Sequence, residues 1–323
     1  MTQIVAVDIG GTHARFALAE VGDGRVSGLT PPVTLQVGDH DSLESAWSEF
    51  RRQQGGTLPG DAAIAVASPV GGEEIRLTNN PWVIRPSTLA ASLGLARYEL
   101  LNDFAAVAHA VAQVGPEHLL HLCGPDMPLP RNGTISVIGP GTGLGVAHIL
   151  SREEHYHVQA TEGGHMGFAP VDPFEDALLA RLRDRHGRVS VERIAAGPGI
   201  VHIYDALAER DGWMGDRPDD RTLWARGASG EDPRAAEAVE RFCLSLGSAA
   251  GDIALAQGAC GVVIAGGLGL RIQDAIRRSG FSERFSAKGR FATMLRQMPV
   301  KLITHPQPGL FGAAAAFARC YRD

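Results

Sequence analysis

The pattern of apolar and polar positions predicts a pair of strands joined by a glycine turn at two places in the chain. Residues 4–9 are mostly aliphatic and run directly into Gly-Gly-Thr at 10–12. Residues 134–138 repeat this pattern before a glycine-rich segment at 139–145. The sequence is extended and apolar again after each segment, so each turn joins two strands and does not open a helix. The duplication indicates a cleft that holds phosphate groups from both sides.

These turns exclude two common nucleotide-binding motifs. A dinucleotide fingerprint places its glycines between a strand and a helix, and a Walker loop places a lysine directly after its last glycine. The only lysines are Lys288 and Lys301, and neither ends a glycine loop. Nucleotide phosphates must therefore be held by backbone N–H groups and a metal ion. Glycine suits this role because it adopts positive φ and lets the backbone approach a ligand closely.

The rest of the chain alternates between strand-like and helix-like segments. Apolar residues at helical spacing predict a helix over about 42–54. Further strands are predicted at 62–67 and 98–103, and further helices at about 104–114, 173–186, 198–210, 233–257 and 313–320. The two β-rich halves carry similar glycine turns about 131 residues apart, which indicates an internal quasi-repeat and not a solenoid array.

Composition limits the class of partner. With 323 residues the chain can form two domains, each with its own core, and its 44% hydrophobic content is typical of a soluble globular protein. The net charge is −6 and no dense run of basic residues is present, which argues against a nucleic-acid surface. We expect partners that are small and neutral or metal-bound.

Cysteine usage and the apolar segments predict a cytoplasmic protein without a membrane span. The four cysteines contain no close pair, so neither a disulfide framework nor a CxxC site is indicated. Met1 leads almost at once into a strand, so no signal peptide is expected. The segment 245–270 is apolar enough to consider as a membrane span, but Asp252, Gln257 and seven glycines predict a helix followed by a strand.

The first candidate for chemistry is Asp8. It stands at the carboxyl end of the first strand, where α/β folds place groups that face a ligand. Its carboxylate there can hold Mg²⁺ through water, because Mg²⁺ keeps much of its hydration shell. The alternative is a turn aspartate that accepts local N–H groups. The adjacent Gly10, Gly11 and Thr12 favour the ligand-binding interpretation.

Two further glycine segments are candidates for nucleotide contacts. The segment 139–145 has four glycines, more than a hairpin needs, and its Gly141, Thr142 and Gly143 are suited to the β- and γ-phosphates. The alternative is a flexible hairpin.

A buried strand at about 261–265 ends in Gly266 and Gly267, which suit a surface behind an adenine or ribose. Taken alone, this junction is better explained as a packing device.

Other polar residues are ambiguous from the sequence alone. Asn102 and Asp103 stand where a strand gives way to a helix, and they are as consistent with helix capping as with a ligand site. The segment 162–165, Glu-Gly-Gly-His, matches no metal motif. Glu192 is an ordinary helix residue by its pattern. His118, His121 and Cys123 resemble a metal site, but a fourth ligand is missing.

Together these segments resemble the bacterial glucokinase family of the hexokinase superfamily, of the type without the zinc-cysteine motif of ROK sugar kinases. The resemblance spans nearly the whole chain, and several motifs in family order are more specific than any one of them. It rests on the segments 8–15, 77–82, 101–104, 139–145, 162–165, 266–268 and 309–313. One departure is His13, which stands where the family commonly has Asn, so a side-chain contact there is not implied.

The resemblance implies an α/β protein with the two-lobed actin-like ATPase fold, which is also called ribonuclease H-like. A small lobe, 1–115, would be completed by a C-terminal helix at about 305–323, and a large lobe would span 116–304. The resemblance also implies a homodimer, and ATP and Mg²⁺ as nucleotide and metal.

The resemblance also implies roles for the ambiguous residues. Five of them would contact glucose hydroxyls: Asn102, Asp103, Glu162, His165 and Glu192. Asp103 would act as the general base while the γ-phosphoryl group of ATP passes in line to the 6-hydroxyl of glucose. Such transition states are loose, so an ordinary Asp pKa suffices, and closure of the lobes would exclude water.

Two other functions stay open at this stage. The same scaffold serves kinases for other hexoses or amino sugars. A sugar-responsive transcriptional regulator is disfavoured, because no helix-turn-helix segment precedes the first strand and Asp103 is retained.

Overall fold

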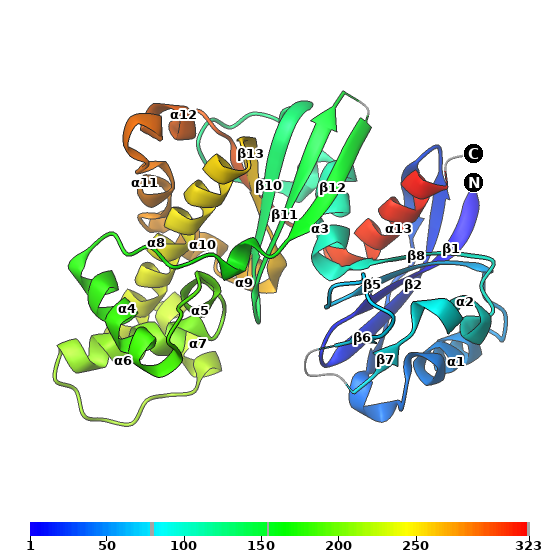
Figure 1. Ribbon diagram of the computed structural model, residues 1–323, viewed down its shortest axis with the longest axis horizontal. Coiled ribbons are helices and arrows are strands. Elements are labelled where there is room, and N and C mark those ends of the chain that lie inside the picture. Colours follow the sequence, from blue (N-terminus) through cyan, green and yellow to red (C-terminus); the bar gives the residue numbers. More distant parts are fainter. Residues whose placement is uncertain (78–80, 154, 322–323) are drawn as a thin grey trace. The chain divides into compact units, whose positions relative to one another are not determined.

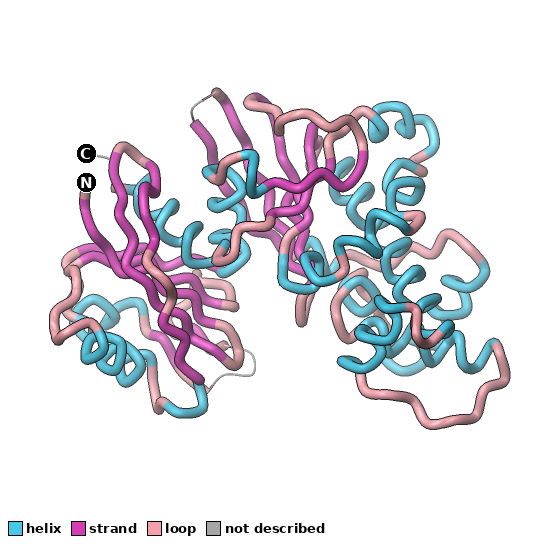
Figure 2. The backbone as a smooth tube through the Cα atoms, turned by 180° about the vertical axis from the view of Figure 1, so that it is seen from behind, coloured by secondary structure: helices cyan, strands magenta, loops and turns pink. Residues whose placement is uncertain are grey.

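The computed structural model describes residues 1–77, 81–153 and 155–321. The chain divides into two compact units. Unit 1 comprises Met1–Gly115 and His305–Asp323, and unit 2 comprises Pro116–Thr304. Each unit contains one large sheet with helices beside it (Figure 2).

Unit 1 is built on a mixed sheet with the strand order β3-β2-β1-β5-β8, in which β4 also pairs with β2 (Figure 1). The strands are β1 Thr2–Ile9, β2 His13–Gly22, β3 Arg25–Leu29, β4 Val33–Gln36, β5 Asp61–Val66 and β8 Arg97–Asn102. β1 and β2 are antiparallel, whereas β1, β5 and β8 run parallel. A small separate sheet pairs β6 Ile75–Arg76 with β7 Val83–Ile84.

Helices cover both faces of the unit 1 sheet (Figure 1). They are α1 Leu43–Gln53 and α2 Pro86–Leu93 on one face, and α3 Asp103–Gln113 and α13 Pro308–Cys320 on the other. Alternate residues of β1 separate these faces, since Val5 and Val7 join the cluster with α1 and α2 while Ile4 and Ala6 join the cluster with α13. The α13 face is rich in alanine, which allows the helix to lie close to the strands.

Unit 2 repeats the strand arrangement of unit 1. Its order is β12-β11-β10-β13-β14-β9, with antiparallel pairing from β12 to β10 and parallel pairing from β10 to β14. The strands are β9 Leu119–Cys123, β10 Asn132–Pro140, β11 Leu144–Arg152, β12 His155–Thr161, β13 Ala259–Ile264 and β14 Val300–Ile303. The matching order confirms the predicted quasi-repeat.

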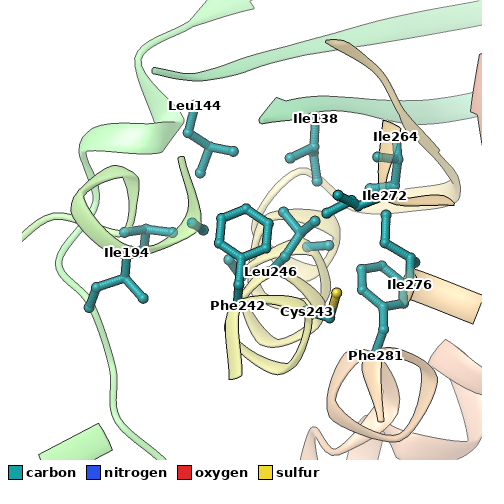
Figure 3. Packing of buried hydrophobic residues seen from close by; sticks show 14 of the residues in the cluster. Ile138, Leu144, Ile194, Phe242, Cys243, Leu246, Ile264, Ile272, Ile276 and Phe281 are labelled. Atoms are coloured by element: carbon teal, nitrogen blue, oxygen red, sulfur yellow. The ribbon is translucent and has the colours of Figure 1, made fainter. Parts of the chain in front are cut away.

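The helices of unit 2 surround the long helix α8. They are α4 Pro173–His186, α5 Glu192–Ala195, α6 Gly199–Arg210, α7 Asp220–Ser229, α8 Pro233–Ala256, α9 Gly266–Arg271, α10 Gln273–Arg278, α11 Phe281–Ser286 and α12 Ala292–Arg296. Phe242 and Leu246 of α8 lie in a fully buried cluster between Ile138 and Ile264 of the sheet and Phe281 of α11 (Figure 3).

The predicted glycine turns at 10–12 and 139–145 each join two strands, as expected. Two other predictions need correction. Gly266 and Gly267 do not merely end a strand, because they begin α9, and Gly266 adopts a φ of 82° beside the carbonyl of Pro140. Helix α7 was not predicted, although Asp219 caps it.

The cysteine and membrane predictions can be compared with the structure directly. All four cysteines are free. The segment 245–270 forms the end of α8, then β13 and the start of α9, as predicted in outline. Within the described ranges, no helix combines the length and the apolar character needed to cross a membrane.

Candidate functional site

In unit 1, Asp8 forms an ion pair with Arg15. The two residues lie opposite each other in the β1–β2 hairpin, and Arg15 Nη1 donates to Asp8 Oδ2 at 3.3 Å. Burial raises the pKa of Asp8, and the positive charge of Arg15 opposes that rise. Arg15 was missed as a partner, but the hairpin register would have revealed it, because a turn that pairs Ile9 with Ala14 also pairs Asp8 with Arg15.

The carboxyl group of Asp8 also packs against the start of α13. A Cβ atom placed on Gly309, in the first turn of this helix, would lie 2.7 Å from Asp8 Cγ. Only glycine leaves room for the carboxyl group at this point. The N-terminal end of a helix carries a partial positive charge, which favours a carboxylate.

Asn102 and Asp103 occupy the junction between β8 and α3. Asn102 Oδ1 accepts the N–H groups of Phe104 and Ala105 at 2.9 and 3.2 Å, and its Nδ2 donates to Ser68 O at 3.4 Å. Asp103 Oδ1 accepts the Phe104 N–H at 2.8 Å. The capping interpretation is therefore correct for Asn102, and the carboxylate of Asp103 stands next to this cap.

Asp103 and Asp8 interact electrostatically. Burial and, to a smaller extent, the charge of Asp8 raise the pKa of Asp103 to about 6, against the opposing effect of the Phe104 N–H. A partly buried carboxylate whose pKa is raised by burial and by a second carboxylate is typical of a site that handles protons or binds a cation.

The two glycine turns present backbone N–H groups in a similar way. Gly10 N donates to His13 O at 3.0 Å, and Gly141 N donates to Gly143 O at 2.8 Å. Among the described residues, none accepts a hydrogen bond from the amides of Gly11 and Thr12, or from those of Thr142 and Gly143. These four amides are therefore suited to bind phosphate oxygens.

Unit 2 brings together three of the residues that the family resemblance implicated. His165 Nε2 lies 3.7 Å from Glu162 Oε2, and His165 Nδ1 lies 3.9 Å from Glu192 Oε1. Glu162 precedes a short 3-10 turn, Gly163–His165, and Glu192 is the first residue of α5. Two carboxylates and an imidazole at this spacing can donate to and accept from several hydroxyl groups of one small ligand.

Glu192 additionally contacts the second glycine turn. Its Oε2 accepts the Leu144 N–H at 2.8 Å, and a Cβ atom on Gly143 would lie 2.6 Å from the same oxygen. The partners are 48 residues apart in the sequence. The sequence pattern of Glu192 therefore contains no signal of this contact.

Glycines from other segments also pack closely on this turn. A Cβ atom on Gly266 would lie 2.7 Å from Pro140 O, and one on Gly197 would lie 2.9 Å from Gly141 O. A Cβ atom on Gly164 would overlap the carbonyl of Leu144. Gly267 follows Gly266 in the first turn of α9, so the strand-to-helix junction lies beside the glycine turn.

The remaining candidates add little to the site. Residues 78–80 of the 77–82 motif lie outside the described residues. His13 contacts Gln36 Nε2 through its Nε2 at 3.1 Å, and His121 Nε2 lies 2.9 Å from Gly124 O. In the described part of the chain, no group of three or more His, Cys, Asp or Glu residues is placed to hold a metal ion.

Sequence relatives cover the whole chain. A family model described as Glucokinase matches residues 5–320. The glucokinase of Zymomonas mobilis subsp. mobilis is 55% identical over 321 residues, which cover 99% of each chain. The glucokinase of Xanthomonas campestris pv. campestris is 41% identical over 319 residues, which cover 97% of this chain and 94% of the relative.

Solved structures show the same fold. The crystal structure of a glucokinase from an Antarctic psychrotroph has a TM-score of 0.86 and 35% identity, over 98% of each chain. A glucokinase from Balamuthia mandrillaris in complex with glucose has a TM-score of 0.81 at 20% identity, over 98% of this chain and 94% of that one. A ROK family glucokinase from Streptomyces griseus, with a TM-score of 0.64 at 19% identity, covers 99% of this chain and 100% of that one. The last two share the fold alone.

Proposed function

Because the chain belongs to the glucokinase family, we propose that it transfers the γ-phosphoryl group of ATP to the 6-hydroxyl of glucose and so forms glucose 6-phosphate and ADP. The observation that carries this proposal is the 55% identity to a glucokinase over 99% of both chains. The actin-like ATPase fold of the structural neighbours agrees with it.

Five side chains would bind the sugar. Asn102 and Asp103 belong to unit 1, whereas Glu162, His165 and Glu192 belong to unit 2. In unit 2, His165 lies within 4.0 Å of both Glu162 and Glu192, which gives a cluster of hydrogen-bonding atoms. A site built from such groups rejects an analogue without the matching hydroxyl, because its polar atoms would stay unpaired.

Asp103 would accept the proton of the attacking hydroxyl. Its pKa of about 6 leaves the carboxylate mostly ionised at pH 7 and makes it a better base than an ordinary Asp. Asn102 supports this role, because it caps α3 and thereby fixes the backbone on which Asp103 stands. A loose phosphoryl-transfer transition state needs no stronger base than an ordinary Asp, so the raised pKa of Asp103 is more than it requires.

The ATP phosphates would be bound by the amides of Gly11, Thr12, Thr142 and Gly143. Gly266 and Gly267 would lie behind the adenine or ribose.

Asp8 is the residue suited to hold Mg²⁺ through water, since its partly buried carboxylate lies near Asp103 and pairs with the cation of Arg15. The absence of a three-ligand cluster among the described residues fits an ion whose other ligands are water and phosphate oxygens. Bound with ATP, Mg²⁺ would neutralise phosphate charge.

A coupled assay of ADP release tests this function. The purified protein is given ATP and Mg²⁺ with glucose, fructose, mannose, N-acetylglucosamine or N-acetylmannosamine. We expect a strong preference for glucose, and a loss in kcat of about 10²-fold or more in Asp103→Ala. Preference for another sugar would replace glucose as the substrate, and near-normal turnover by Asp103→Ala would remove Asp103 from the mechanism.

The oligomeric state and the cellular location of the enzyme are part of the same proposal. We propose a homodimer that acts in the cytoplasm, in line with the family resemblance and the free cysteines. Sedimentation of the purified protein measures its mass in solution, and a single monomeric species at micromolar concentration would contradict the dimer.

A further inference from the structure

We propose that Glu192 has a second role as a positioning residue, in which it holds the phosphate-binding turn 139–145 in shape before any sugar is bound. The inference rests on the proposed function, because it takes the turn to be the phosphate site. It goes further because it gives the Glu192 carboxylate two tasks. The carboxylate contacts the sugar, and it also supports the separate segment that binds the nucleotide phosphates.

The two carboxylate oxygens of Glu192 contact different partners. Oε2 accepts the Leu144 N–H at 2.8 Å, whereas Oε1 lies 3.9 Å from His165 Nδ1, on the side of the sugar-binding cluster. A hydrogen bond to an ionised acceptor is stronger than one between neutral groups. The bond to Leu144 is complete within the protein and needs no ligand.

The segment that begins at Glu192 contacts the turn at two points, on either side of Thr142 and Gly143. The Glu192 side chain accepts the amide of Leu144, and Gly197 N donates to Gly141 O at 2.7 Å. Gly197 is itself held in place, because Trp224 Nε1 donates a hydrogen bond to its carbonyl oxygen at 3.1 Å. The turn is therefore held on both sides, and the amides of Thr142 and Gly143 between them stay available.

The supporting segment is itself anchored in the core. Ile194 of α5 is fully buried, and Leu144 has 4% of its surface exposed. Both side chains belong to the cluster around α8, where Figure 3 shows them on the same side of Phe242. Glu192 thus connects the start of α5 to the start of β11, and Thr142 and Gly143 of the turn come directly before Leu144.

Close packing shows that Glu192 and the turn fit each other. A Cβ atom on Gly143 would lie 2.6 Å from Glu192 Oε2, so any side chain at this position would push the carboxylate out of its present place. Without the carboxylate, the Leu144 amide would lose its partner inside a buried segment, and the turn would be free to change conformation. We therefore expect nucleotide binding to weaken even when no sugar is present.

The test is the affinity for AMPPNP with Mg²⁺ in the absence of sugar, measured by calorimetry. Glu192→Ala should weaken binding about tenfold, which is the size expected for a lost charge-assisted hydrogen bond. Glu192→Gln should restore most of the affinity, because its amide oxygen can accept the Leu144 N–H. Glu162→Ala is the matched variant, since it removes the other carboxylate beside His165 and leaves the bond between Glu192 and Leu144 in place.

Each outcome separates the inference from the function on which it rests. Unchanged affinity in Glu192→Ala, with weaker glucose binding, would overturn the second role and leave the sugar contact. A folded wild-type protein that binds no AMPPNP would overturn both this inference and the proposed phosphate site. Hydrogen exchange of the Leu144 amide gives a second readout, and we expect it to be faster in Glu192→Ala and nearly normal in Glu192→Gln. Equal exchange in all three proteins would contradict the proposal.

Discussion

Replacement of Asp103 by asparagine should stabilise the folded protein above pH 6 while removing most of its activity. Burial and the charge of Asp8 raise the pKa of Asp103 from 3.8 to about 6. The folded protein therefore binds this proton more tightly than the unfolded chain, and the ionised carboxylate lowers stability at neutral pH. Asparagine has nearly the same shape, can accept the Phe104 N–H as Asp103 Oδ1 does, and has no charge to bury.

The size of this effect follows from the two pKa values. One pKa unit corresponds to 1.36 kcal/mol, so the rise from 3.8 to about 6 amounts to about 3 kcal/mol once the group is fully ionised. Below pH 3.8 the group is protonated in both states and the cost disappears. The cost grows as the pH rises toward 6 and is complete above it. For a unit of this size, about 3 kcal/mol should raise Tm by about 5 °C or more.

Calorimetric melts of both proteins between pH 4.5 and 8, without nucleotide or Mg²⁺, measure the difference. The gain of Asp103→Asn should be small at pH 4.5 and reach its full size above pH 7, and kcat should fall by about 10²-fold or more. Asp219→Asn is the control, because the Thr222 N–H lowers the pKa of Asp219 and no gain at high pH is expected. A difference in Tm that does not vary with pH, or a less stable Asp103→Asn at pH 8, would refute the reasoning.

Three more predictions concern the surroundings of these carboxylates. In the wild-type enzyme kcat/KM should fall as the pH drops through about 6, where Asp103 becomes protonated. Asp8→Asn should move this fall to lower pH in a pH–rate profile, because the charge of Asp8 raises the pKa of Asp103. An unchanged profile would show that the charge of Asp8 does not affect Asp103. Gly309→Ala should lower kcat/KM in steady-state kinetics by about tenfold or more, because its Cβ would lie 2.7 Å from Asp8 Cγ. Gly312→Ala should destabilise the protein by about 1–3 kcal/mol in thermal melts, since its Cβ would overlap the carbonyl of a neighbouring helix. Gly38→Ala should melt like the wild type, because nothing lies within 4 Å of its added Cβ.

The sheet hairpins could be predicted because their signal is local. Aliphatic runs next to glycine turns determine where each pair of strands begins and ends, and the structure confirms both pairs. The order of the strands is not local, since β10 pairs with β13 more than a hundred residues later. Helix α7 was missed because the segment leading into it, 211–220, is rich in Gly, Asp and Arg and predicts a loop, although the cap at Asp219 was a usable sign.

The candidate site was only partly predictable, because some of its contacts join residues that are far apart in the sequence. Asp8 was recognisable from its position at the end of β1 and before two glycines. Asn102 and Asp103 remained ambiguous, because a helix cap and a ligand site favour the same residue types, and in the structure Asn102 is a cap. Glu192 has no distinguishing pattern, since its partner at Leu144 is brought to it only by the folding of unit 2. Only the family resemblance assigns Glu192 a contact with the sugar, and that role stays a prediction.

The return of α13 to unit 1 has a consequence for biosynthesis. This helix covers one face of the unit 1 sheet, where Leu310 and Phe317 pack with Ile4, Ala63 and Leu101. On the ribosome, the residues Pro116–Thr304 must be made before α13 emerges, which takes roughly 10 to 40 s at typical rates of synthesis. During that interval this apolar face of the first sheet has only α3 as cover. The nascent chain should therefore depend on holding chaperones more than its mature structure suggests.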